Sequence, residues 1–321
     1  MRRAAPLTLL AALAAPLPAQ DATWRDPSPH TVRFVEANGV RLHVLDWGGT
    51  GALVVLLPGY GMTAHVYDDV APLLVKSGYH AVAITPRGFG ESSASDSAAY
   101  TIAAATDDLR AVLDSLRTGR VALVAHSFSG QVITLFAARH PARVAKLVYL
   151  DAFPNYTALR GDAVGDREPV QPPPFTGDTT IANIRAWLVR TIHGTWTPAL
   201  EADLHAKPGG VEGARRRSLF SRFLEDQALH SSDLTQVAAP ALQMCAVTST
   251  AARYPWLTAG APEFARADHY DRATERPFWR RACADFARQV QRGTTVDFPG
   301  GHYVFFYEAA KTARIIARFL N

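Results

Sequence analysis

Residues 121–130 read Val-Ala-Leu-Val-Ala-His-Ser-Phe-Ser-Gly, and this stretch decides the fold. It begins with a short apolar run typical of a strand buried on both faces, and residues 131–139 after it have the spacing of a helix. Ser127 falls between the two, with small residues, Ala125 and Ser129, on either side, as a tight turn requires. The pattern predicts a serine on a sharp strand-to-helix turn, where the helix N-terminus favours a developing negative charge. Taken alone, it is equally typical of a helix N-cap.

Strand and helix signals alternate on both sides of this turn. Asn38-Gly39 predicts a β-hairpin, because both residues accept the positive φ angles of a tight hairpin turn. Strands are predicted at residues 32–35, 40–45, 52–57, 81–84, 121–124, 147–150, 241–247 and 294–298, and helices at 66–76, 102–116, 131–139, 274–290 and 308–320. The alternation favours an α/β fold with a mostly parallel central sheet flanked by helices.

The alternation is interrupted between residues 153 and 236. Three consecutive prolines at 172–174 break the chain, and helical patterns follow without strands. These helical patterns cover residues 181–192, 198–205 and 214–228. We therefore expect one core in two parts, 20–152 and 237–321, with 153–236 inserted as a helical cap or lid.

The first residues resemble an export signal rather than part of the fold. A basic start, Met1-Arg2-Arg3, precedes an uncharged apolar run over residues 4–17, and Ala19 stands before a polar residue. This is the pattern of a signal peptide over residues 1–19, and the run is too short to span a bilayer comfortably. We expect a secreted or periplasmic protein without stable membrane insertion. In such a compartment Cys245 and Cys283 are free to pair, but the sequence leaves the disulfide open.

Composition excludes several other classes of protein. With 321 residues, 48% of them hydrophobic and 19% charged, the chain is too apolar for disorder and long enough for a large core. The net charge is +4, and the basic residues are scattered. The tightest run, at residues 215–217, lies beside Glu212 and Glu225 and is interpreted as a solvated helix face, so no nucleic-acid partner is expected.

A base and an oxyanion hole complete the expected site around Ser127. His302 follows the last predicted strand in a Gly-rich loop, from which it can act as general base and then protonate the leaving group. The glycines in residues 57–61, Leu-Pro-Gly-Tyr-Gly, allow backbone N–H groups to approach a substrate oxygen. The N–H groups of Tyr60 and Phe128 are therefore the predicted oxyanion donors.

Residues 59–64 also fit a dinucleotide-binding loop, although only loosely. That kind of site requires an acidic residue about 20 positions further on to hold the ribose. The next strand ends instead in Thr85-Pro86-Arg87. No cofactor is therefore expected.

Together these segments resemble the α/β-hydrolase superfamily with a helical cap. The matching segments are residues 57–61, residues 85–92, the turn at Ser127, and Gly300-Gly301-His302. In order and spacing they cover the chain from about residue 30 to its end. Two positions depart from the usual pattern, because Pro58 replaces a histidine and Thr85 replaces an aspartate. The resemblance implies a hydrolase with a nucleophile–histidine–acid triad.

The acid of the triad does not stand at its usual place. The superfamily usually has it just after the strand predicted at 241–247, where this chain has no carboxylate. Some relatives place it one strand earlier, and here Asp151 directly follows that strand. Asp151 is therefore the preferred group to orient His302, although it is also interpretable as a carboxylate at the chain's entry into the lid. The alternatives are Glu263 and Asp297.

The sequence therefore predicts an exported serine hydrolase that cleaves carboxylic esters through an acyl-enzyme. Ser127 attacks the acyl carbon, His302 moves the proton and Asp151 orients His302. A serine here argues against the dehalogenase and epoxide-hydrolase branches of the superfamily, which use aspartate. No metal is expected, because the chain has no His-Glu-x-x-His motif and no closely spaced set of His, Cys and carboxylate residues.

The expected partner is a small molecule with an apolar acyl or alcohol part. Aromatic residues of the insertion are candidates to line its pocket, although aromatics at helical spacing more often form a core: Trp187, Trp196, Phe220 and Phe223. Two other functions stay open. One is a hydroxynitrile-lyase-like enzyme, in which His302 acts only as a base. The other is a non-catalytic binding protein that kept the fold.

Overall fold

The computed structural model describes residues 24–94, 99–152, 170–208 and 234–321, together with single residues between 212 and 226. The expected signal peptide at 1–19 lies outside the described residues, as does most of the predicted helix at 214–228.

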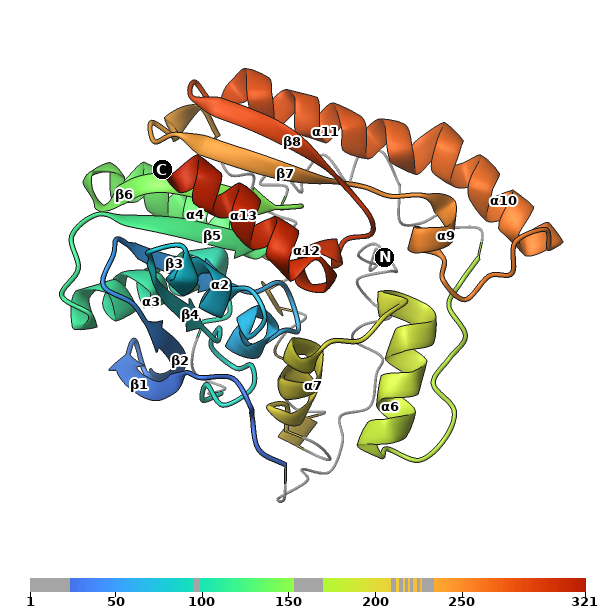
Figure 1. Cartoon of the computed structure of the whole chain (residues 1–321), viewed down its shortest axis with the longest axis horizontal. Coiled ribbons are helices and arrows are strands. Elements are labelled where there is room, and N and C mark those ends of the chain that lie inside the picture. Colours follow the sequence, from blue (N-terminus) through green and yellow to red (C-terminus); the bar gives the residue numbers. More distant parts are fainter. Residues whose placement is uncertain are drawn as a thin grey trace.

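In the described part of the chain, eight strands form one sheet in the order β1-β2-β4-β3-β5-β6-β7-β8 (Figure 1). β2 pairs antiparallel with β1 and with β4, and every other neighbouring pair is parallel. The strands are β1 Thr31–Ala37, β2 Val40–Gly48, β3 Leu53–Leu57, β4 His80–Ile84, β5 Val121–His126, β6 Val144–Leu150, β7 Ala241–Val247 and β8 Gly293–Pro299. The predicted mostly parallel sheet is confirmed, and so is the hairpin at Asn38-Gly39, whose φ angles are 51° and 76°.

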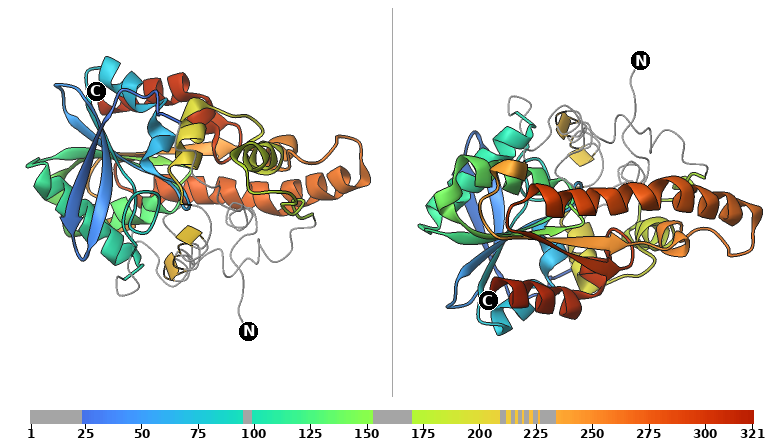
Figure 2. Two further views of the ribbon diagram at one scale, coloured as in Figure 1. Left: turned by 90° about the horizontal axis from the view of Figure 1, so that it is seen from below. Right: turned by 90° about the horizontal axis from the view of Figure 1, so that it is seen from above.

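Helices cover both faces of the sheet, as Figure 2 shows. They are α2 Ala71–Lys76, α3 Ile102–Ser115, α4 Ser129–Arg139, α6 Ile181–Leu188, α7 Pro198–His205, α9 Thr250–Arg253, α10 Pro262–Tyr270, α11 Arg276–Gln289, α12 Val304–Tyr307 and α13 Ala309–Leu320. Short 3-10 turns are η1 Ala64–Tyr67, η2 Pro141–Arg143 and η4 Leu234–Gln236, and π turns are η3 Val189–His193 and η5 Asp271–Glu275. None of the helices described is both long and apolar enough to cross a bilayer.

The core has two apolar layers, one on each side of the sheet. Val55 and Leu57 pack against residues of α3, α4 and α11, whereas Val54 and Leu56 pack against residues of α2, α12 and α13. Because side chains alternate across a strand and both faces are covered, the central strands read as continuous apolar runs. The central strands are therefore buried on both faces, and their carboxyl ends, which carry the candidate site, are held in place by this packing.

Two helix predictions were wrong in detail. The helix expected at 66–76 is the short turn η1 followed by α2, because Pro72 lacks an N–H group and is tolerated only in the first turn of a helix. The helix expected from residue 274 begins at Pro262, since α10, η5 and α11 run on as one long helix that projects beyond the sheet (Figures 1 and 2).

The start of this long helix was missed because it has few apolar residues. Its buried anchor is the carboxylate of Asp271, which is fully buried and forms ion pairs with Arg276 and, at 3.2 Å, with Arg253. The pair with Arg253 of α9 joins residues 18 positions apart in the chain, and hydrophobic periodicity does not report such pairing.

A disulfide joins Cys245 of β7 to Cys283 of α11, with 6.4 Å between their Cα atoms. The sequence left this pairing open. The disulfide links α11 covalently to strand β7 of the sheet.

Between β6 and β7, the described residues form α6, η3, α7 and η4, with further helical residues between 212 and 226, and contain no strand. Figure 1 shows α6 and α7 to one side of the sheet, below α12 in this view. The boundaries of a separate cap, 153–236, remain a proposal, because residues 153–169 lie outside the described residues.

Candidate active site

The predicted nucleophile turn lies between β5 and α4. Ser127 has a φ angle of 54°, a left-handed conformation that costs energy for a residue with a Cβ atom, and its side chain is buried. Its N–H group donates to the carbonyl of Leu150 at 3.2 Å, which ties the turn to the end of β6. A Cβ atom at Gly130 would lie only 2.7 Å from that of Ala152. The absence of a side chain at Gly130 therefore allows α4 to pack closely against the chain that follows β6.

The predicted oxyanion loop packs directly against this turn. A Cβ atom at Gly59 would lie 2.4 Å from His126 Nδ1 and 3.2 Å from Ser127 Cβ, so only glycine fits there. The Ser129 hydroxyl donates to the Pro58 carbonyl at 2.5 Å, which explains how the loop is held without the usual histidine. Tyr60, the residue after Gly59, has a buried side chain, and its ring lies 6.2 Å from that of Phe128, edge-on.

Asp151 lies against His302. Their Oδ2 and Nδ1 atoms are 2.7 Å apart, and the imidazole N–H group donates. The other carboxylate oxygen, Oδ1, accepts from the N–H group of Ala246 at 2.9 Å, so neither oxygen is free to turn away. Asp151 also has a positive φ angle, 44°, at the end of β6. Such strain persists only where the surrounding structure holds it, and it is common at functional sites.

The two alternative carboxylates are placed elsewhere. Glu263 is exposed on α10 and pairs with Arg266 at 3.1 Å, and Asp297 is exposed on β8. Of the three candidates, the structure brings Asp151 to His302.

His126 is a functional candidate that the sequence reasoning missed. Its ring lies on that of His302 with the centroids 4.5 Å apart, and its Nε2–H group donates to the His302 carbonyl at 2.9 Å. Burial, together with the charge of His302, places the pKa of His126 well below its usual range, so it is neutral. His126 therefore holds the His302 backbone beside the nucleophile turn without adding a charge. Its position directly before Ser127 was the available signal.

The helical segment between β6 and β7 reaches the site through Phe223. This ring is fully buried and lies 5.7 Å from the ring of Phe128, 6.2 Å from that of Phe89 and 5.4 Å from that of Tyr100. The other aromatic residues predicted to line the pocket have different contacts or lie outside the described residues. Trp187 packs within its own segment and donates to the Pro173 carbonyl, and Trp196 donates to Glu201, while Phe220 lies outside the described residues.

Two polar contacts attach the same segment to the core. Thr63, just after the oxyanion loop, donates from its N–H group and its hydroxyl to Asp203 Oδ1 of α7, at 2.7 and 2.8 Å. His193 of η3 lies 2.6 Å from the Tyr307 hydroxyl through Nδ1, and its ring is 4.8 Å from that of Tyr303, the residue after His302. These contacts hold the segment against Thr63 on one side of the candidate site and against Tyr303 and Tyr307 on the other.

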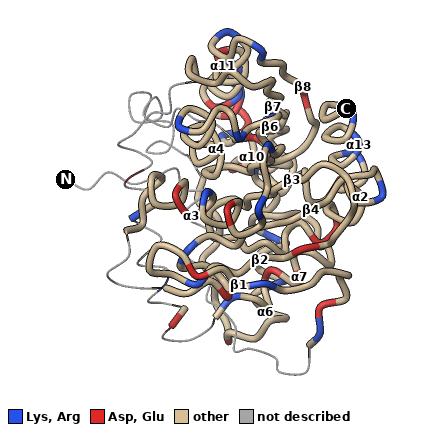
Figure 3. The backbone as a smooth tube through the Cα atoms, turned by 90° about the vertical axis from the view of Figure 1, so that its left-hand side faces the viewer, with Lys and Arg blue, Asp and Glu red and all other residues tan. Residues whose placement is uncertain are grey.

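The interpretation of residues 215–217 as a solvated face was wrong at Arg216. Its guanidinium donates to the backbone carbonyls of Gly90 and Ser92, at 2.5 and 2.9 Å, and pairs with Glu212. Arg215 and Arg217 lie outside the described residues. Elsewhere, Figure 3 shows the basic positions interspersed with acidic ones along the described chain.

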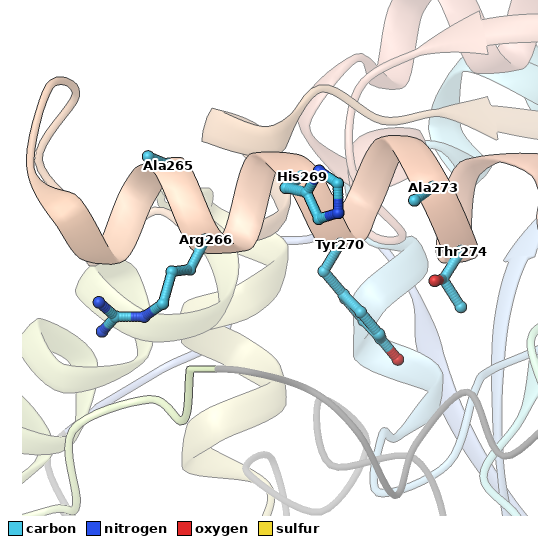
Figure 4. A pocket seen from close by; sticks show the side chains of 6 residues that line it. All are labelled: Ala265, Arg266, His269, Tyr270, Ala273 and Thr274. Atoms are coloured by element: carbon cyan, nitrogen blue, oxygen red, sulfur yellow. The ribbon is translucent and has the colours of Figure 1, made fainter.

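A groove on the long helix is separate from this site. It is lined by residues of α10 and η5, shown in Figure 4: Ala265, Arg266, His269, Tyr270, Ala273 and Thr274. None of these belongs to the predicted site, and we assign no ligand to the groove.

Comparisons with known proteins agree with this geometry at the level of the fold. A family model described as the alpha/beta hydrolase fold matches residues 52–190. A probable hydrolytic enzyme from Pseudomonas aeruginosa has a similar structure, with a TM-score of 0.68 and 19% identity, over 96% of this chain and 99% of that one. The chain therefore has the α/β-hydrolase fold, as its motifs predicted.

Curated relatives match over a shorter region. Epoxide hydrolase A of Mycobacterium tuberculosis is 37% identical over 122 residues, which are 37% of this chain and 38% of that protein. A fluoroacetate dehalogenase of a Burkholderia species is 34% identical over 128 residues, or 39% of this chain and 41% of that protein. The chain thus spans about two fifths of the length of these relatives.

Proposed function

We propose that the protein is an exported serine hydrolase that cleaves carboxylic esters, with Ser127, His302 and Asp151 as its catalytic residues. The observation that carries the proposal is the 2.7 Å contact between His302 Nδ1 and Asp151 Oδ2. Support also comes from His126, the residue before Ser127, which donates to the His302 carbonyl at 2.9 Å and so brings His302 near the nucleophile turn. A serine after β5, a carboxylate after β6 and a histidine after β8 are the groups of a triad that activates a serine nucleophile.

The chemistry follows from the roles these groups can take. His302 accepts the Ser127 proton through Nε2 as the hydroxyl oxygen attacks the acyl carbon, and Asp151 stabilises the resulting imidazolium. The N–H groups of Tyr60 and Phe128 stabilise the tetrahedral oxyanion. His302 then protonates the leaving alcohol, and an activated water releases the acyl group from Ser127 by the same steps.

An apolar acyl or alcohol part suits the surroundings of the site. The rings of Phe89, Phe128 and Phe223 lie together beside the nucleophile turn. We propose that residues 153–236 act as a lid whose Phe223 and Asp203 contacts close this side. The named relatives act on epoxides and fluoroacetate, but a serine at residue 127 supports acyl transfer over the aspartate chemistry of those branches.

The test is ester hydrolysis by the purified mature protein. A chain-length panel of p-nitrophenyl esters is expected to show steady turnover that Ser127→Ala abolishes. Ser115→Ala, which alters an exposed serine of α3, serves as the control and retains activity. A folded wild-type protein without turnover on any ester or amide would contradict the proposal and favour the binding-protein alternative. Cleavage of cyanohydrins without ester turnover would favour the lyase.

Export is tested separately. We propose that residues 1–19 direct secretion and are removed near Ala19. N-terminal sequencing of the protein from the periplasm or medium is expected to begin close to Gln20, and an intact N-terminus on cytoplasmic protein would contradict this.

A further inference from the structure

Four side chains converge where the segment before β1 crosses η1. We call them the His/Asp cluster: Asp26, His30, His65 and Asp68. One ligand atom from each lies within 4.8 Å of all the others. No metal site was predicted from the sequence, because the two pairs of the cluster are far apart in the chain. Asp26 and His30 precede β1, whereas His65 and Asp68 follow β3. The fold brings them together.

The spacing within the His/Asp cluster fits a small cation. His65 Nδ1 is 2.7 Å from Asp26 Oδ2 and 3.0 Å from Asp68 Oδ2. His30 Nε2 is 3.1 Å from Asp26 Oδ2 and 3.6 Å from Asp68 Oδ1. Each imidazole nitrogen therefore lies between the carboxylates of Asp26 and Asp68. Tetrahedral ligands at about 2.0–2.2 Å from a zinc ion lie roughly 3.3–3.6 Å from one another, so small shifts would complete the geometry.

Burial supplies a second reason for a ligand. The side chains of His30, His65 and Asp68 are only 7%, 8% and 4% exposed. Among the residues described, buried Asp68 Oδ1 accepts no hydrogen bond, although it points at His30 Nε2 across 3.6 Å. A buried carboxylate oxygen without a hydrogen bond is costly, and a metal ion bound between the four groups would remove that cost.

Neighbouring groups hold the ligands in place. Asp26 Oδ1 accepts from the Ser28 N–H group at 2.8 Å, so Oδ2 faces the cluster. Trp47 donates from Nε1 to the Ser28 hydroxyl at 2.9 Å, and its ring meets that of His30 edge-on at 5.4 Å. Such outer contacts orient metal ligands.

We propose that the His/Asp cluster is a structural zinc site. Two imidazoles and two carboxylates suit zinc, whereas calcium prefers six to eight oxygen ligands. Four protein ligands leave no open position for substrate, so the site stabilises the fold and takes no part in the chemistry at Ser127. It fixes the segment before β1 to η1, which follows the predicted oxyanion loop.

The test uses tag-free, full-length protein that has been stripped with EDTA and equilibrated with micromolar ZnCl2. Elemental analysis is expected to find about one zinc per chain, and the melting temperature should rise by several degrees and fall again with EDTA. Asp68→Asn and His30→Gln should each lose most of the zinc and the rise in melting temperature. Calcium chloride should reproduce neither effect.

The matched control is His80→Gln, which breaks a separate His–Asp contact, the 2.8 Å pair of His80 with Asp46. This variant should retain one zinc per chain. Wild-type protein that binds no zinc, or variants that keep it, would overturn the proposal. Circular dichroism checks that each variant is folded. If one is not, Asp26→Asn replaces it in the comparison. None of these readouts depends on ester hydrolysis, so the site fails or stands independently of the proposed function.

Discussion

At the scale of single residues, the candidate site depends on conformations that few residues adopt. Ser127 and Asp151 both have positive φ angles, 54° and 44°, at the ends of adjacent strands. Each is tied across to the neighbouring strand through its backbone N–H group, Ser127 to Leu150 and Asp151 to Met244. The surrounding ladder thus holds two strained residues at one edge.

The choice of acid gives a direct prediction. Asp151→Asn should reduce kcat for ester hydrolysis roughly 10²- to 10⁴-fold, because the amide no longer fixes the tautomer of His302 or stabilises its cation. Steady-state kinetics of the matched variants Glu263→Gln and Asp297→Asn should give kcat close to that of the wild type. A near-normal kcat in Asp151→Asn would remove Asp151 from the mechanism.

At the scale of elements, the helical segment between β6 and β7 is attached to the core through buried polar contacts. His193 is partly buried against Tyr303 and Tyr307. Burial lowers the pKa of His193 to about 3, and the charge of Lys207 contributes. The imidazole therefore stays neutral in the folded chain and accepts the Tyr307 hydrogen bond.

A pH dependence of stability follows from this shift. Below about pH 6.5 the unfolded chain protonates His193, but the folded chain does so only near pH 3. The unfolded state therefore binds more protons in this window, and the free energy of unfolding must fall as the pH falls. Urea unfolding between pH 7 and 5 should show a shallower decline in His193→Asn than in the wild type. His269→Asn removes an exposed imidazole as the control, and equal slopes in all three proteins would contradict the prediction.

The sequence was most informative about the strands and helices. The continuous apolar run at β5 and the alternation around it predicted the sheet, since burial on both faces leaves that pattern. The helix α10 was not predicted, because it has few apolar residues and because buried Asp271 of η5, which follows it, pairs with Arg253 of α9, far away in the sequence.

The candidate site was predictable from the sequence only where its residues stand in local sequence patterns. Ser127 and His302 stand in local patterns, a small-residue turn and a Gly-rich loop. Asp151 could be ranked first, but only the fold could show its contact with His302. His126, Asp203 and the His/Asp cluster depend on contacts between segments far apart in the chain, which no local pattern reports.

At the scale of the whole molecule, a covalent link joins the helix α11 to strand β7 of the sheet. The disulfide of Cys245 and Cys283 spans 38 residues of chain. Cross-linking a loop of that length lowers the entropy of the unfolded state, which is worth about 4 kcal/mol on the chain-entropy model.

Removal of this link should therefore be measurable. Cys283→Ala is expected to lower the free energy of unfolding by about 3–4 kcal/mol in urea titrations. Dithiothreitol should lower the stability of the wild type by a similar amount and leave the variant unchanged. Detection of two free thiols in the denatured, unreduced wild type would show that the cysteines are not paired.

The most direct test of the central claim, that Ser127 is an activated nucleophile, is covalent labelling. A fluorophosphonate probe should react with the folded protein at neutral pH, and mass spectrometry of the digest should place the adduct on Ser127. Labelling should disappear in Ser127→Ala and slow strongly in His302→Gln, because the hydroxyl needs a base. An unlabelled, folded wild-type protein, or an adduct on any other serine, would contradict the account.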